Sequence, residues 1–271
     1  MTDDAKEYHS KDFEWEELRN EIENDPSLSY HLQQEAVNSD SPSQDDSLAW
    51  NNFHTSHSTG KFFKERRYLF KEFPDLASSS LVLEVGCGNG STALPILRAT
   101  ETALVFACDC SIEALERAKQ NIRASNALSR FHPFYYSNAD GKCCIGGVDV
   151  VTLIFTLSAV PFNRMPAAIS ECFSVLKPGG LLLFRDYGLY DMTMLRFEPG
   201  QKMGFREYKR SEGTRSYFFS LDSARNLFKG VGFIELELDY CCIKSVNRRN
   251  GKSMRRVTKT SLAPSLISCR E

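Results

Sequence analysis

A glycine-rich segment, Leu83 to Gly90 (LEVGCGNG), follows a short apolar run and precedes a helical pattern. Glycine lets a backbone approach a ligand closely, and the start of a helix offers free N–H groups. A dinucleotide fingerprint needs its third glycine five residues after Gly86, where this chain has Ser91. No Lys-Ser/Thr pair follows the loop as it would in a P-loop, because Gly90 is followed by Ser91 and Thr92. The segment therefore predicts a binding loop for a different small molecule.

Asp109 stands at the end of the next apolar run, 23 residues after Gly86. A carboxylate at this point of an α/β fold can accept two hydrogen bonds from a ribose diol. The alternative is a helix-capping role, because Ser111 begins the next helical pattern. We expect Asp109 to bind a ribose.

Strand and helix patterns alternate along most of the chain and must position these residues. Strand-like runs cover 81–85, 103–107, 131–136, 148–155, 181–184 and 233–242, and helical patterns cover 112–122, 165–176 and 221–229. Repeated β-α-β order predicts a mostly parallel sheet with helices on both faces. The predicted fold class is therefore α/β.

The formal net charge of −2 conceals two oppositely charged parts. Residues 1–48 hold 14 acids and 3 bases, and residues 49–271 hold 21 acids and 30 bases. We interpret 1–48 as an acidic, disordered tail, with a partner-docking helix over 13–22 as the alternative. The basic body is a candidate for binding a polyanion, and its bases concentrate in 61–67 and 244–270.

Composition argues against several other classes of protein. No apolar run reaches the roughly 18–20 residues that a membrane helix needs, and the acidic N-terminus resembles no signal or transit peptide. The nine cysteines include no CxxC pair, which argues against a zinc site or a disulfide framework. We expect no metal, no membrane contact, and a reducing location: the cytoplasm, with the nucleus as a second possibility.

The order of these features resembles the class I S-adenosylmethionine-dependent methyltransferases. Three features carry the likeness, over about residues 80–240: E-x-G-x-G-x-G from Glu84, the acid Asp109, and Leu-Lys-Pro-Gly-Gly at 176–180. The resemblance implies a Rossmann-like fold with a mostly parallel seven-stranded sheet, and S-adenosyl-L-methionine as cofactor.

Segments 50–64, 153–160 and 184–219 further resemble the eukaryotic tRNA N3-methylcytidine methyltransferases. The strings FRDYGLYD and GTRSYFF within the last segment are not generic to the fold. This resemblance implies methyl transfer to N3 of the cytidine at position 32 of the tRNA anticodon loop. It implies seryl-tRNA synthetase as a partner. The methyltransferase domain would span 49–271, with a cofactor- and RNA-facing segment at 49–75 and a substrate-facing insertion at 185–220.

The family likeness also implies a set of cofactor-binding residues. They are Trp50, His54, Gly86, Gly88, Asp109, Ile154, and Asn138 or Asp140. The family has Tyr where this chain has His54, and plain core packing is the alternative for Ile154. The adenine-binding acid expected after the third strand has no direct counterpart, because Ser137 takes its place when the sequences are compared without gaps. A small shift brings in Asn138 or Asp140, and an Asn oxygen can also accept from an amine.

Methylation at N3 makes limited demands on catalytic groups. N3 of neutral cytosine already carries a free lone pair, so the site must chiefly hold it in line with the methyl group and the sulfur. Positive charge moves onto the base, and a nearby carboxylate would stabilise it; our candidate is Asp186, at the end of the fifth strand. Arg185 and Tyr190 are further catalytic candidates that would clamp or stack on a flipped nucleotide. Packing of a cap over the sheet is the alternative for both.

Two rival functions stay open at this point. One is a methyltransferase for a small molecule or a protein. The other is a catalytically inactive subunit that binds cofactor or RNA. The divergent segment at 137–140 keeps the second rival open, as does the Thr/Lys/Ser-rich stretch 257–267, where the family has an apolar final strand.

Overall fold

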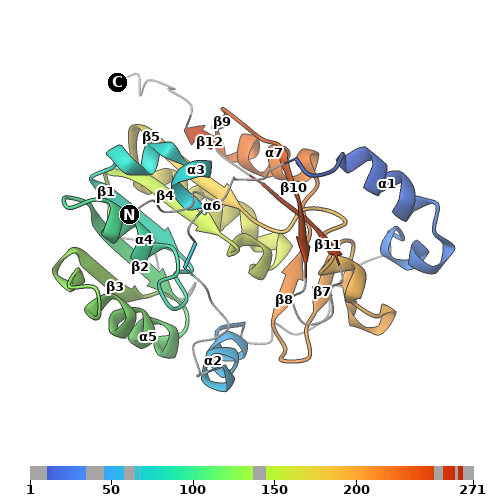
Figure 1. The fold of residues 1–271 in the computed structure, drawn as a ribbon, viewed down its shortest axis with the longest axis horizontal. Helices are drawn as coiled ribbons and strands as arrows, with labels where there is room; N and C mark the ends of the chain where they lie inside the picture. Colours follow the sequence, from blue (N-terminus) through green and yellow to red (C-terminus); the bar gives the residue numbers. More distant parts are fainter. Residues whose placement is uncertain are drawn as a thin grey trace.

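Five parallel strands form the centre of the main sheet, and two short strands extend it at one side (Figure 1). The structure is a computed structural model that describes residues 11–34, 46–57, 65–66, 68–136, 145–246, 253–259 and 262–264. The main sheet contains β1 (Leu81–Val85), β2 (Leu104–Asp109), β3 (Phe131–Tyr135), β4 (Val148–Ile154), β5 (Leu176–Arg185), β9 (Phe233–Glu235) and β12 (Leu262–Pro264). Their order is β3-β2-β1-β4-β5-β12-β9, with β12 antiparallel to both of its neighbours. The predicted Rossmann-like class is confirmed: five of the seven strands form a continuous parallel core.

Helices cover both faces of this sheet, as the alternating pattern predicted. One face packs against α3 (Leu69–Glu72), α4 (Ala93–Ala99) and α5 (Ile112–Arg123), and the other against α6 (Met165–Val175) and α7 (Leu221–Val231). Two helices begin as the sequence indicates. Ser111 and Ser220 each accept a hydrogen bond from the backbone N–H three residues later, which caps α5 and α7.

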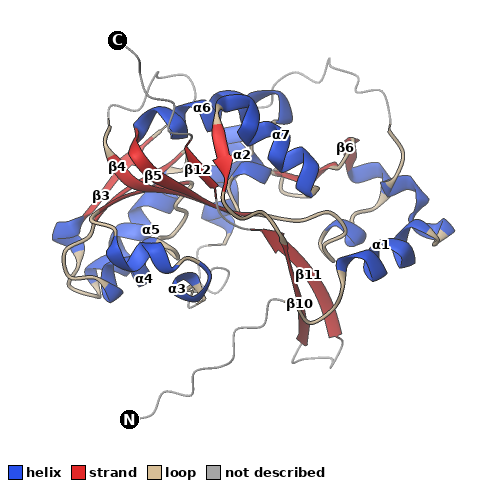
Figure 2. Cartoon of the chain, turned by 90° about the horizontal axis from the view of Figure 1, so that it is seen from above, coloured by secondary structure: helices blue, strands red, loops and turns tan. Residues whose placement is uncertain are grey.

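The single strand predicted over 233–242 is wrong, because the structure divides it in two. β9 has a partner in the main sheet for only three residues. The chain then leaves the sheet as β10 (Tyr240–Val246), which pairs antiparallel with β11 (Ser253–Lys259). This two-stranded hairpin extends away from the main sheet (Figure 2). The last strand of the main sheet, β12, spans only three residues within the Thr/Lys/Ser-rich stretch 257–267.

The insertion after β5 forms a small sheet of its own, with β6 (Lys202–Gly204), β7 (Glu207–Lys209) and β8 (Arg215–Tyr217) in that order. Its core is mostly aromatic. Tyr208 and Phe218 are completely buried there, and Phe197 stacks on Tyr208 at 4.9 Å between ring centroids.

The interpretation of residues 1–48 as a disordered tail is wrong for 11–34, which fold against this insertion (Figure 1). α1 (Trp15–Glu23) places Leu18 and Ile22 one turn apart on the same face, and both are buried. The Trp15 ring stacks on Tyr240 at 4.5 Å, and its indole N–H donates to the carbonyl of Leu189. The apolar stripe of α1 outweighs its acidic character, because Glu16, Glu17 and Glu21 are exposed to solvent. The end of the supposed tail belongs to α2 (Asp46–Ser56).

A buried histidine fastens the other end of this N-terminal segment. His31 lies in the 3-10 helix Pro26–His31, and its Nδ1 shares a 2.7 Å hydrogen bond with the hydroxyl of Tyr208. Burial, with a smaller contribution from Lys202, lowers the pKa of His31 from 6.5 to about 4. The ring is therefore neutral in the folded protein at pH 7.

None of the helices in the described ranges is long and apolar enough to span a bilayer. Those ranges also hold no group of three or more His, Cys, Asp or Glu side chains that could bind a metal ion.

Acidification should weaken the attachment of residues 11–34. His31 binds a proton near pH 6.5 when released and only near pH 4 when buried, so its contribution to stability is complete above pH 6.5 and is lost as the pH falls toward 4. At pH 5.5 we expect a loss of about 1 kcal/mol. Hydrogen exchange of the α1 amides at pH 7 and pH 5.5 measures it. His31→Phe should remove this pH dependence; an unchanged dependence in that variant would assign the effect to another group.

Candidate active site

The glycine loop leaves β1 in a conformation that requires glycine. Gly86, Gly88 and Gly90 have positive φ angles of 70°, 52° and 82°. A Cβ atom on Gly86 would lie 2.4 Å from Cγ2 of Thr156, at the exit of β4, so the two strands come close together there. A Cβ on Gly88 would meet only His54, at 3.9 Å. The loop is thus closed against protein at Gly86 and has room for a ligand at Gly88.

Asp109 joins this loop to the end of β2. One of its carboxylate oxygens accepts a hydrogen bond from the N–H of Gly88 and the other from the N–H of Ser111, each at 2.9 Å. Burial raises the pKa of Asp109, and these backbone donors oppose that rise. The capping role belongs to Ser111 itself, which accepts from the N–H of Ala114. Each oxygen of Asp109 retains a lone pair that a ribose hydroxyl can use.

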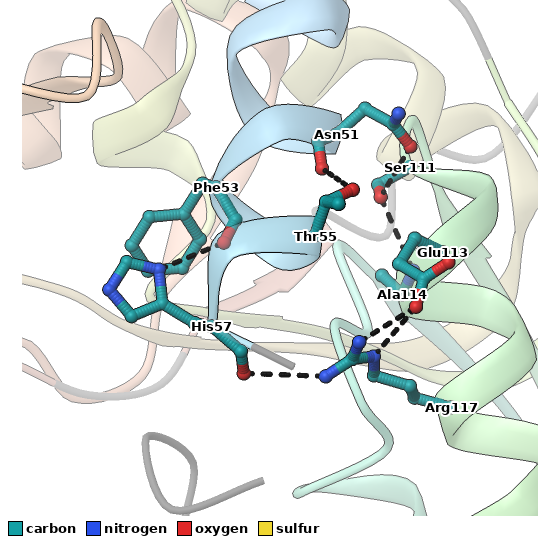
Figure 3. A network of polar contacts seen from close by, with 8 residues as sticks. All are labelled: Asn51, Phe53, Thr55, His57, Ser111, Glu113, Ala114 and Arg117. Carbon is teal, nitrogen blue, oxygen red and sulfur yellow. Dashed lines mark hydrogen bonds and ion pairs between the residues drawn. The ribbon is translucent and has the colours of Figure 1, made fainter. Parts of the chain in front are cut away.

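Helix α2 lies beside this edge of the sheet and is tied to α5 (Figure 3). Ser111 donates to the side chain of Asn51 at 3.2 Å, and Arg117 donates to the carbonyl of His57 while it pairs with Glu113. The same helix carries Trp50 and His54, whose ring centroids are 6.1 Å apart. The expected position of His54 over the glycine loop agrees with its proximity to Gly88.

His54 is neutral in this position. Its side chain is buried, and burial, together with the charge of Arg117, lowers its pKa from 6.5 to about 4. A neutral imidazole adds no positive charge next to a cationic ligand, and it keeps the flat ring that stacking requires. The change from the family's Tyr therefore preserves the ring but not a phenol donor.

A second buried carboxylate lies below the loop. Glu84 is 3% exposed, and burial raises its pKa to about 7, although a hydrogen bond from Thr92 opposes this rise. Its Oε2 atom has no hydrogen-bond partner among the described residues. The site thus holds a partly ionised acid directly behind the glycine loop.

Asp186 fastens the exits of β4 and β5 to each other. It accepts from the backbone N–H of Ser158 and from that of Tyr187, both at 2.8 Å. Burial raises its pKa to about 6, and hydrogen bonds from the side chain and backbone of Ser158 oppose the rise. The expected place of Asp186 at the carboxyl end of β5 agrees with the structure. Its side chain is buried, so its influence on a substrate would be electrostatic.

Arg185 has structural partners instead of an open position. Its guanidinium forms an ion pair with Glu72 of α3, and these side chains are only 5% and 2% exposed. It also lies over the Tyr68 ring, 4.2 Å from the centroid. A direct contact with a nucleotide would require α3 to move, so this arrangement favours the packing alternative.

Tyr190 is likewise enclosed. Its hydroxyl donates to Glu23 of α1 at 2.8 Å, and its ring stacks on Trp15. Its φ of 67° is unusual for an aromatic residue, and the packing around it maintains that conformation. The sequence could not indicate this cover, because α1 lies some 170 residues earlier in the chain.

The remaining predicted residues fall into two groups. Ile154 ends β4 and belongs to the hydrophobic core on the α4 and α5 face, as its alternative interpretation expected. Ser137, Asn138 and Asp140 lie outside the described residues, so the adenine contact stays a prediction. Thr156, which lies against Gly86 from the exit of β4, was missed, because β4 is next to β1 in the sheet but not in the sequence.

These residues fit S-adenosyl-L-methionine. One end of the glycine loop has the features that bind a nucleoside: space at Gly88, the lone pairs of Asp109 and the flat ring of His54. The carboxylates of Glu84 and Asp186 lie at the adjoining strand exits, which suits the positive charges of an aminoacyl sulfonium.

Comparisons with known proteins agree with this fit. A family model described as a methyltransferase domain matches residues 82–180. Human tRNA N(3)-cytidine methyltransferase METTL6 is 38% identical over 217 residues, which covers 77% of this chain and 76% of that protein. The METTL2 tRNA N(3)-cytidine methyltransferase of Danio rerio is 35% identical over 251 residues and is covered to 70% of its length.

Solved structures of other methyltransferases share the fold. A SAM-dependent methyltransferase from Methanosarcina mazei superposes with a TM-score of 0.50 at 18% identity, covering 68% of this chain and 92% of that one. The O-methyltransferase NcsB1 of neocarzinostatin biosynthesis, solved with S-adenosylmethionine, gives a TM-score of 0.54 at 15% identity, covering 82% and 59%. Identities this low concern the fold alone. The glycine loop, the acid after β2 and the extent of the sequence identity together place this chain in the S-adenosylmethionine-dependent tRNA N(3)-cytidine methyltransferase family.

Proposed function

We propose that this protein methylates N3 of the cytidine at position 32 in the tRNA anticodon loop. Its membership of the family supports methyl transfer to tRNA cytidine. The observation that carries the proposal is the junction at Asp186, which fastens the exit of β4 to the start of the insertion beside the glycine loop. A base held there would lie next to a cofactor held at Gly88 and Asp109.

The chain's own residues serve mainly to position the reactants. Gly88, Asp109 and His54 hold the nucleoside end of the cofactor, and the exits of β4 and β5 form the wall next to it. When bound, S-adenosyl-L-methionine supplies an activated methyl group. N3 of cytosine needs no deprotonation, which agrees with a site whose nearest acids, Glu84 and Asp186, are buried. Asp186 stabilises the positive charge that develops on the base, because a low-dielectric surrounding strengthens its field.

The RNA contacts come from the insertion and the elements around it. Arg210 lies over the Tyr187 ring at 5.8 Å and donates to its hydroxyl, which pairs a cation with an aromatic face at the insertion. Lys244 opens the basic segment of the β10–β11 hairpin. Phosphate contacts of this type make affinity depend on salt.

A partner and a location complete the proposal. We propose that seryl-tRNA synthetase presents the tRNA, and that the reaction takes place in the cytoplasm or the nucleus. The family resemblance supports these statements.

The first test is methylation of a defined RNA. The purified chain with S-adenosyl-L-methionine should form N3-methylcytidine in an unmodified serine tRNA, faster when seryl-tRNA synthetase is added, and mass spectrometry of the nucleosides detects it. A transcript with uridine at position 32 is the matched control. Product in neither arm would favour the inactive subunit. Methyl transfer without RNA would favour a small-molecule or protein substrate.

Asp109 and Asp186 should separate binding from turnover. Asp109→Ala removes two acceptors from the loop, so its Kd for S-adenosylhomocysteine should rise about tenfold or more. Asp186→Asn should leave that Kd within about twofold while kcat falls about a hundredfold. Calorimetry and single-turnover rates measure the two quantities. Equal effects of the two variants on binding would contradict this division.

The pH profile offers a further check on Asp186. Because its pKa is about 6, wild-type kcat should rise with pH through about 6 as the carboxylate ionises. Asp186→Asn should lack this inflection. If the variant keeps the same inflection, another group controls turnover.

A further inference from the structure

Arg66 is held against the glycine loop although it lies 20 residues before it. Its backbone N–H donates to the carbonyl of Ser91 at 3.2 Å, and its side-chain Nε donates to the hydroxyl of Thr92 at 3.1 Å. Thr92 also bonds the carboxylate of Glu84. These contacts fix both the backbone and the side chain of Arg66 at the cofactor edge, and not on an outer surface as its basic neighbours in the sequence suggested.

The direct contacts of the Arg66 guanidinium are with neutral groups. It lies over the ring of Phe155 at 5.0 Å from the centroid and donates weakly to the hydroxyl of Tyr68, at 3.4 Å. In the described part of the chain, no carboxylate forms an ion pair with it. Burial raises the pKa of Glu84 and Asp186, and Arg66 acts against both rises, so its charge lies near both acids.

Phe155 maintains this arrangement at a conformational cost. Its φ is +56°, a left-handed conformation that is rare for an aromatic residue. Its backbone N–H donates to the carbonyl of Arg185 at 2.7 Å, and its half-buried ring lies between Arg66 and Tyr187, 5.1 Å from the latter. Strain of this type persists where the surrounding structure needs a particular side-chain position. Here it keeps an aromatic face beneath the guanidinium.

A half-buried cation that contacts only neutral groups directly is suited to an anion. S-adenosyl-L-methionine carries one anionic group, the carboxylate of its amino-acid portion. It also carries an ammonium and a sulfonium, which suit the acids on either side of Arg66. A planar guanidinium can donate two parallel hydrogen bonds to a carboxylate.

We propose that Arg66 binds the carboxylate of the cofactor's methionine portion, and that Phe155 is the positioning residue that holds the guanidinium there. The proposal rests on S-adenosyl-L-methionine as the donor in the proposed function. It can be tested without tRNA, so its failure is distinguishable from a failure of the tRNA assignment.

Two ligands that differ only in the carboxylate provide the test. S-adenosylhomocysteine has this group, and its decarboxylated analogue S-adenosyl-3-thiopropylamine lacks it. Arg66→Met keeps most of the side-chain volume and removes the charge. Calorimetry of Arg66→Met should show a Kd for S-adenosylhomocysteine that is raised about ten- to hundredfold and an unchanged Kd for the analogue. Arg66→Lys should recover part of the lost affinity.

Two further variants sharpen the result. Phe155→Leu retains apolar volume without an aromatic face, and it should weaken S-adenosylhomocysteine several-fold while the analogue binds as before. Arg123→Met, which changes an exposed arginine at the end of α5, is the matched control and should alter neither Kd.

Three outcomes would overturn the proposal. Unchanged binding of S-adenosylhomocysteine by Arg66→Met would remove the carboxylate contact. An equal loss for both ligands would mean that Arg66 supports the fold of the loop. Unchanged cofactor binding, with weaker tRNA binding and a salt dependence reduced by about one phosphate contact, would assign Arg66 to the RNA backbone instead.

Discussion

The carboxylate of Asp109 joins the glycine loop to the start of α5 at the edge of the sheet where the candidate site lies. It holds the N–H of Gly88 on one oxygen and the N–H of Ser111 on the other, so the loop after β1 and the start of α5 share one anchor. The capped start of α5 in turn holds α2 through Asn51. Asp109 thus contributes to the position of His54 over the glycine loop, together with the contact of Arg117 with the carbonyl of His57. Burial makes this arrangement firm, because a charged group without these donors would be costly to keep there.

At the exits of β4 and β5, buried side chains also join separate elements. Asp186 ties the loop at Ser158 to the start of the insertion, and the neighbouring Arg185 ties the insertion side of the sheet to α3 through Glu72. The consecutive residues Arg185 and Asp186 thus contact different elements, α3 and the loop after β4 respectively. One stabilises the framework by a buried ion pair, and the other leaves a carboxylate with a pKa of about 6 near the proposed reaction centre. A buried pair of this type is costly to break, which suits a junction that must not move.

The structure of the acidic N-terminal segment changes how we interpret the division between the acidic residues 1–48 and the basic residues 49–271. Residues 11–34 lie on the insertion, so the described part of the negative segment is built into the lobe that we propose to contact RNA. Trp15 and Leu18 supply the apolar contact and Glu23 accepts from Tyr190, while the other acids of α1 (Glu16, Glu17 and Glu21) are exposed. The exposed acids of α1 would repel the phosphates of a tRNA that binds the insertion, and so restrict the direction from which it can approach.

The sequence alone determined the fold class, the glycine loop, Asp109 and the place of Asp186, because each depends on local patterns: strand runs, glycine spacing and an acid at a strand end. Only the tertiary structure decided the partners of Arg185 and Tyr190, the folding of α1 and the position of Arg66. Each of these depends on contacts between segments distant in the chain, such as Tyr190 with Glu23 or Arg66 with Thr92. Residue types alone could not distinguish a nucleotide clamp from a buried ion pair, since Arg and Tyr serve both. The difference lies in which side chains the fold brings to within hydrogen-bonding distance.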